Sequence, residues 1–249
     1  MVTLKSKSEL ETMRAAGRIV FGVLEELKNH VRAGVSTADL DKVAEEFIRA
    51  RGGIPSFKGL YGFPATLCTS INEEIVHGIP SKKRVLTDGS VVTADVGVLL
   101  DGLHADSART YAVGEISPEA QRLLKVTEES LYAGIKQARA GNHIGDIGHA
   151  VQTVAEGAGF GVVRELVGHG IGRTFHEEPQ VPNYGRPKRG PLLKVGMTIA
   201  IEPMITAGDP ATRTLDDKWT VVTVDGSLSA HFEHTVAITE NGPVILTTA

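Results

Sequence analysis

One plan of helices and strands occurs twice along this chain of 249 residues, with a constant offset of 107 residues. The tripeptide Arg-Ala-Gly at 32–34 recurs at 139–141, and an aspartate follows each copy at the same interval. At the same offset, the β-rich run 89–95 aligns with 196–202, and both runs end in a carboxylate. The interval is too long for a solenoid unit, so it predicts one duplication inside a single domain. That domain covers 1–249, and its halves cover roughly 8–115 and 116–245.

Helical spacing of apolar residues predicts two helices at the start of each half. Ser8-x-x-Glu11 has the form of a capping box, and Ser117-Pro118 is an N-cap followed by proline at the first helical position. The predicted helices cover 9–34, 38–49, 118–141 and 146–156. The predicted strands cover 91–99, 105–113, 198–205, 219–224 and 231–238. This order indicates the α+β class, with a curved antiparallel sheet and helices on its outer face.

Carboxylates occupy positions in the predicted strands that should be apolar. A buried carboxylate costs several kcal/mol unless it is paired or bound to a metal, and Asp is disfavoured in strands. The acidic residues in these runs are Asp95, Asp106, Glu202 and Glu233. A single acidic residue in a strand more often lies at a β-bulge or at the edge of a sheet. However, Asp95 and Glu202 are equivalent in the repeat, which a chance edge position does not explain.

A pair of divalent cations would compensate four carboxylates that meet in one place. Two metals ~3.5–4 Å apart can be bridged by carboxylates and can activate a water for hydrolysis. The best candidate for an imidazole ligand is His169 in the glycine-rich run 168–172, although a histidine in such a turn is more often structural. One imidazole among carboxylates suits Mn, Fe, Co or Zn rather than Mg or Ca. The residues therefore predict a dinuclear metal centre.

Composition and charge exclude other classes of protein. The formal net charge of −4 argues against a dominant nucleic-acid surface. Basic runs at 82–84 and 186–189 are interpreted as solvated loops, with a transient contact to the ribosome as the alternative. Cys68 is the one cysteine, which excludes a disulfide framework and indicates a reducing compartment. The sequence contains neither a signal-peptide core nor a membrane-length apolar run, so we expect a cytoplasmic protein with no membrane segment. We also expect it to be a monomer.

The acidic residues and His169 belong to a set of longer motifs. These are Asn-Glu-Glu-Ile-Val-His-Gly-Ile-Pro at 72–80, Asp95 with Asp106, Gly-His-Gly-Ile-Gly at 168–172 continuing to Phe-His-Glu-Glu-Pro at 175–179, Ile-Glu-Pro-Met at 201–204 and Phe-Glu-His-Thr at 232–235. Over about residues 5–245 the chain resembles the type I methionine aminopeptidases, which have the pita-bread (creatinase/aminopeptidase) fold. The resemblance implies an enzyme that removes the initiator methionine from nascent proteins and peptides.

The resemblance also implies roles in an attack of metal-activated water on the first peptide bond. The implied metal ligands are Asp95, Asp106, His169, Glu202 and Glu233. Asp106 and Glu233 would bridge the two ions, Asp95 would chelate one of them, and Glu202 would also be the general base. The implied catalytic histidines, which also contact the substrate, are His77 and His176. His77 would contact the scissile amide or aid proton transfer, and His176 would stabilise the oxyanion. Taken alone, each of these histidines has a structural interpretation as well.

The resemblance further implies an apolar pocket for the methionine side chain. Its residues are Phe63, Cys68, His77, Phe175 and Trp219. Leu60 and Phe63 stand where the family often has two tyrosines, so we expect weaker ordering of ligands at the lip of the pocket. Lys218 stands in place of a common glycine, which leaves the conformation of its loop open. A monovalent cation is also implied, near Asn72, Glu74 and Ser229.

Two other functions fit parts of this pattern. A proline-directed relative, an Xaa-Pro aminopeptidase or a prolidase, shares the five ligands and the fold. Such relatives usually carry an extra N-terminal domain, for which a first helix near residue 9 leaves no room. A metal-free binding module on the same fold would have lost ligands, and all five are present. Both functions therefore rank below the methionine aminopeptidase interpretation.

Overall fold

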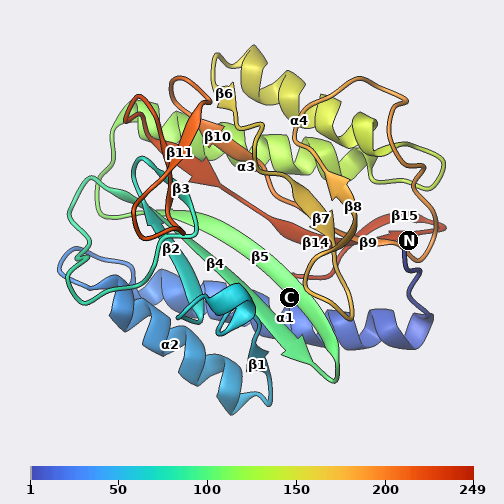
Figure 1. The fold of residues 1–249 in the computed structure, drawn as a ribbon, viewed down its shortest axis with the longest axis horizontal. Helices are drawn as coiled ribbons and strands as arrows, with labels where there is room; N and C mark the ends of the chain where they lie inside the picture. The colour runs from blue at the N-terminus through green and yellow to red at the C-terminus, as the bar shows by residue number, and fades with distance from the viewer. Residues whose placement is uncertain (1) are drawn as a thin grey trace.

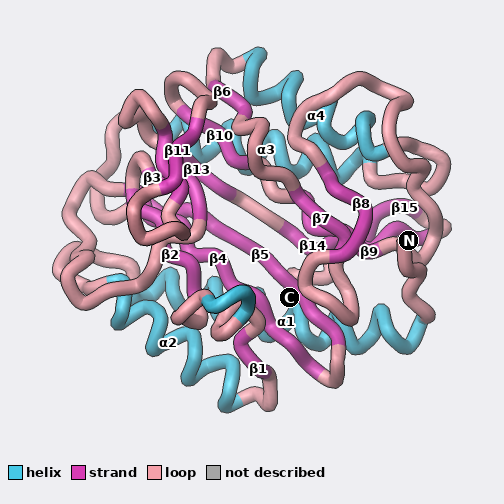
Figure 2. Tube along the Cα trace, in the orientation of Figure 1, coloured by secondary structure: helices cyan, strands magenta, loops and turns pink. Residues whose placement is uncertain are grey.

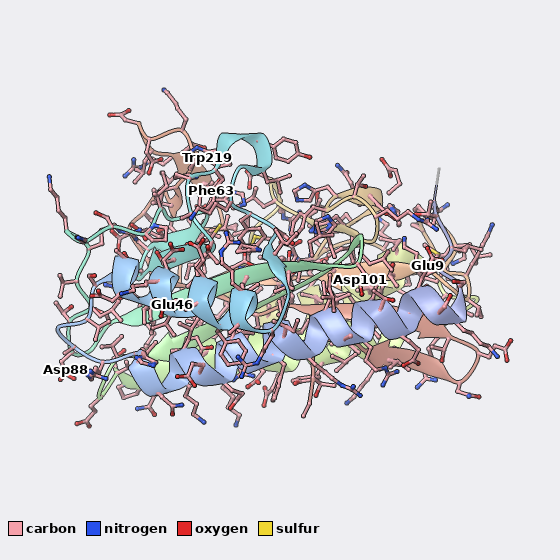
Figure 3. The ribbon with its side chains drawn as sticks, turned by 90° about the horizontal axis from the view of Figure 1, so that it is seen from below. Glu9, Glu46, Phe63, Asp88, Asp101 and Trp219 are labelled. Atoms are coloured by element: carbon pink, nitrogen blue, oxygen red, sulfur yellow. The ribbon has the colours of Figure 1, made fainter. Side chains whose placement is uncertain are left out.

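The computed structural model describes residues 2–249. Antiparallel strands form the middle of the molecule and the long helices lie around them (Figure 1 and Figure 2). Seen from below in Figure 3, α1 (Lys7–His30) lies on one side of the strands, and Phe63 and Trp219 lie on the opposite side. The predicted α+β class with helices on an outer face is confirmed.

The second helix of each half repeats at the offset found in the sequence. α2 (Thr37–Ala50) and α4 (Ile144–Gly157) both have 14 residues and begin 107 residues apart. Their N-cap residues, Ser36 and His143, form isolated bridges to Val85 and Leu192, which are also 107 residues apart. The two helices therefore enter the fold through equivalent contacts.

The capping box of α1 is at Ser6 and Glu9, two residues before the predicted one. Both Ser-x-x-Glu sequences satisfy the local pattern. The earlier one is used because the backbone N–H of Lys5 donates to the carbonyl oxygen of Gly196 at 2.7 Å, which holds the chain just before the helix. A long-range contact thus decides between two equal local signals.

The first helix of each half ends four residues before the glycine predicted to stop it, α1 at His30 and α3 (Pro118–Gln137) at Gln137. Gly34 N donates to Leu86 O at 2.9 Å, and the equivalent Gly141 N donates to Leu193 O at 3.0 Å. These bonds satisfy the glycine N–H groups outside the helix. The predicted helix ends at 34 and 141 were therefore wrong by one turn, for the same reason in both halves.

The strands form antiparallel sheets in both halves. One sheet contains β1 (Ile54–Pro55), β4 (Val91–Leu100), β2 (Leu67–Ile71) and β5 (Leu103–Ala112). Another contains β15 (Gly242–Ile245), β14 (His234–Thr239), β9 (Thr198–Ile201), β7 (Gly168–Gly170) and β8 (Glu177–Val181). Two smaller sheets contain β13 (Ser229–His231), β10 (Met204–Thr206) and β6 (Gly161–Val162), and β11 (Thr212–Thr214), β12 (Val221–Thr223) and β3 (Glu74–Val76).

The two halves meet where β5 and β14 lie side by side in the middle of the molecule (Figure 1). The Thr235 hydroxyl accepts a hydrogen bond from Asp106 N at 2.9 Å and donates to Asp106 O at 2.8 Å. Beside it, Glu233 N donates to Ala108 O at 3.0 Å. These bonds place an acidic residue of the first half next to one of the second.

Two predicted strands are divided at an acidic residue. The run 198–205 forms β9 and β10 with Glu202 between them, and Glu233 lies between β13 and β14. Pro203 follows Glu202 and lacks the N–H that would continue the ladder. The prediction that these two glutamates lie inside strands was wrong. An interrupted ladder can re-aim a side chain, because the strict alternation of a strand no longer applies.

Each helix pair packs on the strands of its own half, which gives two main hydrophobic cores. The first contains α1 side chains such as Leu24 and Leu27 against β4 residues such as Val96. The second contains Leu123 and Ile147 of α3 and α4 against β-strand residues of the second half. Within residues 2–249, the helices are too short or too polar to cross a membrane.

Candidate metal centre

A cavity of about 220 Å³ opens between the halves and gathers the residues singled out in the sequence. The predicted ligands on its wall are Asp95, Asp106, His169, Glu202 and Glu233. The predicted catalytic and pocket residues on its wall are His77, His176, Phe63, Cys68, Phe175 and Trp219. The structure therefore brings together, in one place, side chains spread over more than half of the chain.

Strand pairing places the acidic residues around one point. Asp95 and Asp106 lie on the paired strands β4 and β5, where Asp95 is opposite Ala108 and Asp106 is opposite Gly97. In the other half, pairing of His234 with Ile201 puts Glu233 and Glu202 next to each other at the ends of β14 and β9. His169 lies at the centre of β7, beside β9.

Ligand atoms of Asp106, His169 and Glu233 lie within 4.8 Å of one another, close enough to hold one ion. Asp95, Asp106 and Glu233 each bury a carboxylate oxygen that has no hydrogen-bond partner among residues 2–249. A buried, unpaired anionic oxygen is costly unless a cation neutralises it. The acidic set therefore fits divalent metal binding.

The protonation of His169 supports the same fit. Its Nδ1 lies 2.8 Å from the carbonyl oxygen of Gly170, which can only accept, so the N–H is on Nδ1 and Nε2 carries the lone pair. Nε2 is 3.7 Å from Oε1 of Glu202, which is also an acceptor. Two facing acceptors repel unless a cation or a proton lies between them. A divalent cation there would be bound by both atoms.

Burial shifts the pKa values of all five residues away from their ordinary range. Desolvation, reinforced by the neighbouring carboxylates, raises the pKa of Asp95, Asp106, Glu202 and Glu233 well above the usual carboxyl values. Burial also lowers the pKa of His169 to about 4, so its imidazole is neutral near pH 7. Neutral imidazole is the form that binds a metal.

The two predicted catalytic histidines face the same space. His77 follows β3 in a left-handed conformation with φ 60°, and burial with the nearby His176 lowers its pKa to about 4. The ring of His176 lies 4.4 Å from the ring of His169 and 4.8 Å from that of Phe175, centroid to centroid. Burial lowers the pKa of His176 as well. Both imidazoles are therefore neutral near pH 7 and can donate one N–H.

The apolar end of the cavity is built from aromatic rings. Phe63 and Trp219 meet edge to face with centroids 5.1 Å apart, and Phe175 packs against Phe57 at 5.2 Å. Cys68 lies buried at this end, and desolvation raises the pKa of its thiol well above the usual value. A neutral thiol and aromatic edges suit an unbranched apolar side chain.

The loop that carries Trp219 has a strained residue one position earlier. Lys218 has φ 69°, a left-handed conformation that an L-residue with a side chain adopts at a cost. The Asp217 carboxylate accepts hydrogen bonds from the N–H groups of Trp219 and Thr220, both at 2.9 Å. These bonds hold the turn despite the lysine.

Two residues of the site, Tyr61 and His231, were not predicted from the sequence. Tyr61 is 75 % exposed with φ 50°, yet its ring stacks on His176 at 5.9 Å between centroids, and its hydroxyl lies 3.5 Å from His176 Nδ1. This hydroxyl partly replaces those missing at the lip. His231 lies buried behind Glu202. Its position two residues before Glu233 is the period of a strand and was the signal that could have revealed it.

The residues implied for a monovalent cation are already joined to one another. Ser229 N donates to Asn72 O at 2.9 Å, and Asn72 itself has φ 56°. The carboxylate of Glu74 accepts from Ile71 N at 2.7 Å and is paired with Arg84. One carboxylate oxygen of Glu74 is thus already engaged by two donors.

Comparison with known proteins places this site among metallopeptidases. The family model of metallopeptidase family M24 matches residues 11–240. A methionine aminopeptidase of Bacillus subtilis is 56% identical over 247 residues, which cover 99% of each chain. The crystal structure of a methionine aminopeptidase from Thermotoga maritima is 44% identical, with a TM-score of 0.99 and full coverage of both chains. A prolidase from Pyrococcus furiosus is 22% identical with a TM-score of 0.77 over 99% of this chain and 65% of its own, which is a likeness of fold alone.

Proposed function

Since the chain belongs to metallopeptidase family M24, we propose that its buried acidic cluster and His169 bind two divalent metal ions. Its fold is the pita-bread fold, common to the methionine aminopeptidase and prolidase structures. Its activity is that of a methionine aminopeptidase, the removal of N-terminal methionine, because relatives of that name match it over nearly the whole of both chains. The proposed ligands are Asp95, Asp106, His169, Glu202 and Glu233. The observation that carries the proposal is the set of buried, unpaired carboxylate oxygens beside Nε2 of His169.

The positions of the ligands support a division of the two ions. Asp106 and Glu233 lie between the halves and would be shared by both ions, Asp95 would hold one ion, and His169 with Glu202 would hold the other. One imidazole among carboxylates selects Mn, Fe, Co or Zn. When bound, the two ions supply Lewis acidity that lowers the pKa of a water and polarises the peptide carbonyl.

The protein supplies the proton transfers. The Glu202 carboxylate accepts the proton of the attacking water, because it can face both the water and an ion. In this proposal the Tyr61 hydroxyl donates to Nδ1 of His176, which leaves the N–H on Nε2 to donate to the developing oxyanion. His77 donates its N–H at the scissile amide, and Gly78 behind it packs on the backbone of Thr69.

The methionine side chain binds at the apolar end, between Phe63, Trp219 and Phe175, with Cys68 at its base. Methionine fits there because an unbranched thioether packs well on aromatic edges. Tyr61 and Leu60 form the lip through which the substrate enters. A monovalent cation, bound through backbone oxygens of Asn72, Glu74 and Ser229, would stabilise the turn before β3.

The cellular compartment and the partners of the enzyme are the next part of the proposal. We propose that one catalytic domain over 1–249 acts as a monomer in the cytoplasm on the N-termini of nascent proteins. The buried free thiol of Cys68 supports a reducing compartment. The exposed basic residues in 82–84 and 186–189 are suited to a transient contact with the ribosome.

A peptide panel assayed with several metals tests the proposal. The protein is stripped of metal and supplied in turn with Mn, Fe, Co or Zn, and release of the first residue is measured for Met-Ala-Ser and for Ala-Pro peptides. We expect cleavage of Met-Ala-Ser that requires metal, with two ions bound per chain. A preference for Ala-Pro would refute the proposed substrate, and full turnover without metal would refute the metal centre.

A further inference from the structure

His231 is a buried histidine that the proposed chemistry leaves without a role. It ends β13, and 1% of its surface is exposed. The Thr110 hydroxyl accepts from His231 N and donates to His231 O, both at 2.9 Å, and β13 pairs with β10 opposite Met204. The backbone on both sides of the ring is therefore held, and the position of the ring does not depend on its own polar atoms.

The ring itself has no hydrogen-bond partner. Neither Nδ1 nor Nε2 of His231 meets a donor or acceptor at bonding distance among residues 2–249. Leaving a buried polar group unpaired costs about 1–3 kcal/mol. An apolar side chain in this place would avoid that cost, so the imidazole needs another explanation.

A carboxylate lies near the ring, that of the proposed general base. Nε2 of His231 lies 3.9 Å from Oε2 of Glu202, while Oε1 of the same carboxylate lies 3.7 Å from Nε2 of His169. A distance of 3.9 Å is too long for a hydrogen bond. It is also too short for a bridging water, since two bonds of about 2.8 Å at a tetrahedral oxygen span about 4.5 Å. A small rotation of either side chain closes the gap directly.

The two imidazoles beside Glu202 differ in where their proton can lie. Nδ1 of His169 faces the carbonyl oxygen of Gly170, which places the proton there and leaves Nε2 as a metal ligand. Nδ1 of His231 has no such acceptor, so its ring is free to carry the proton on Nε2. Of the two, only His231 can donate a hydrogen bond to the carboxylate while it is neutral.

We propose that His231 is a positioning residue for Glu202, donating from Nε2 to Oε2 so that Oε1 is held toward the metal and the attacking water. Asn183 Nδ2 donates to the backbone oxygen of Glu202 at 2.9 Å, so the main chain of the glutamate is fixed from one side and its carboxylate from the other. The inference rests on the proposed metal centre. Loss of a hydrogen bond to a metal ligand typically costs about 10–100-fold in metal affinity.

The test compares two side chains of similar size that differ in the donor. Gln at 231 places an amide N–H near the position of Nε2, whereas Met has a similar length and donates nothing. Binding of Mn²⁺ and Co²⁺ to wild-type protein, His231→Gln and His231→Met is measured by titration calorimetry, with the visible spectrum of the Co²⁺ form as a report on ligand geometry. Thermal unfolding of each metal-free protein checks folding. His231→Asn, whose amide lies near the position of Nδ1, takes the place of the Met variant if that variant does not fold.

We expect His231→Met to bind metal about 10–100-fold more weakly, with an altered Co²⁺ spectrum, and His231→Gln to stay within about 3-fold of wild type. In turnover, the Met variant should lose kcat more than it raises KM for Met-Ala-Ser. Wild-type affinity in the Met variant, or an equal loss in the Gln variant, would overturn the inference. Absence of metal binding by the wild-type protein would instead overturn the proposed metal centre.

Discussion

Replacing Gly78 by alanine should disable His77 without touching it. A Cβ at Gly78 would lie 2.0 Å from the carbonyl oxygen of Thr69, and 2.8 Å from its carbonyl carbon. This neighbour is backbone of β2, which cannot rotate away, and Thr69 N is itself bonded to Gly78 O at 2.8 Å. The strand and the residue that follows His77 are thus already in contact.

The structure sets the size of the effect. Separations below 3.0 Å are essentially never seen for a Cβ atom, so the clash at 2.0 Å must be relieved by a backbone shift. The required shift is about 1 Å, and a misplacement of this size in a catalytic group costs about 10²-fold in rate. Overpacking of this kind also destabilises a protein by about 1–3 kcal/mol.

The assay is kcat/KM for Met-Ala-Ser with saturating metal, together with thermal unfolding. Gly157→Ala is the matched control, because that glycine ends α4 without a positive φ and a Cβ there would meet nothing within 4 Å. It should keep wild-type activity and change the free energy of unfolding by less than about 1 kcal/mol. His77→Ala provides the second comparison, with an expected loss of about 10²-fold.

A double variant shows whether the loss passes through His77. If it does, adding Gly78→Ala to His77→Ala should lower kcat/KM little further, since the displaced imidazole is already absent. Wild-type kcat/KM in Gly78→Ala alone would refute the reasoning. A full additional 10²-fold loss in the double variant would show that the shift acts on another part of the site.

Three further outcomes are expected. Asp106→Ala should abolish turnover and binding of the second ion in calorimetry, and substantial activity with added metal would contradict a bridging role. In chelated protein, burial raises the pKa of the site carboxyls, so the folded state holds protons that the unfolded chain releases. The neutral buried histidines contribute the opposite trend up to about pH 6.5, so the carboxyl contribution is measured as the difference between chelated and Mn²⁺-loaded protein. The rise in melting temperature on adding Mn²⁺ should grow as pH rises above about 4, and an identical pH dependence with and without metal would count against the site. Tyr61→Ala should lower kcat/KM about 3–10-fold through loss of stacking on His176, and Tyr61→Phe should lower it less. Equal kcat/KM values in the two variants would exclude the ring as the contributor.

The residues of the proposed metal centre stood out before the fold was known. Asp95 and Glu202 stood out because charged groups in apolar, β-rich runs are costly, and because one offset relates them. His169 stood out through the glycines around it. Such features are local or periodic, and a residue's cost of burial depends on its own type and immediate neighbours. They can therefore be read along the chain, together with the α+β class and the two helix pairs.

Strand pairing, by contrast, depends on contacts between distant segments. The contact of β5 with β14 puts Asp106 beside Glu233, and no spacing in either motif specifies that contact. The hydrogen bond from Lys5 to Gly196, which selects the first capping box, also joins segments that lie far apart in sequence. Likewise, Nε2 of His231 faces Glu202 only after β13 is paired.

The sequence by itself indicated which carboxylates would be costly to bury and that two related halves would contribute them. Only the tertiary structure decided that the strand ladders break at Glu202 and Glu233. It also decided that Tyr61 stacks on His176 and that His231 approaches Glu202. The physical reason is that the identity and spacing of residues set the cost of burying each group. The direction of each side chain is set by hydrogen bonds between parts of the chain that lie far apart in sequence.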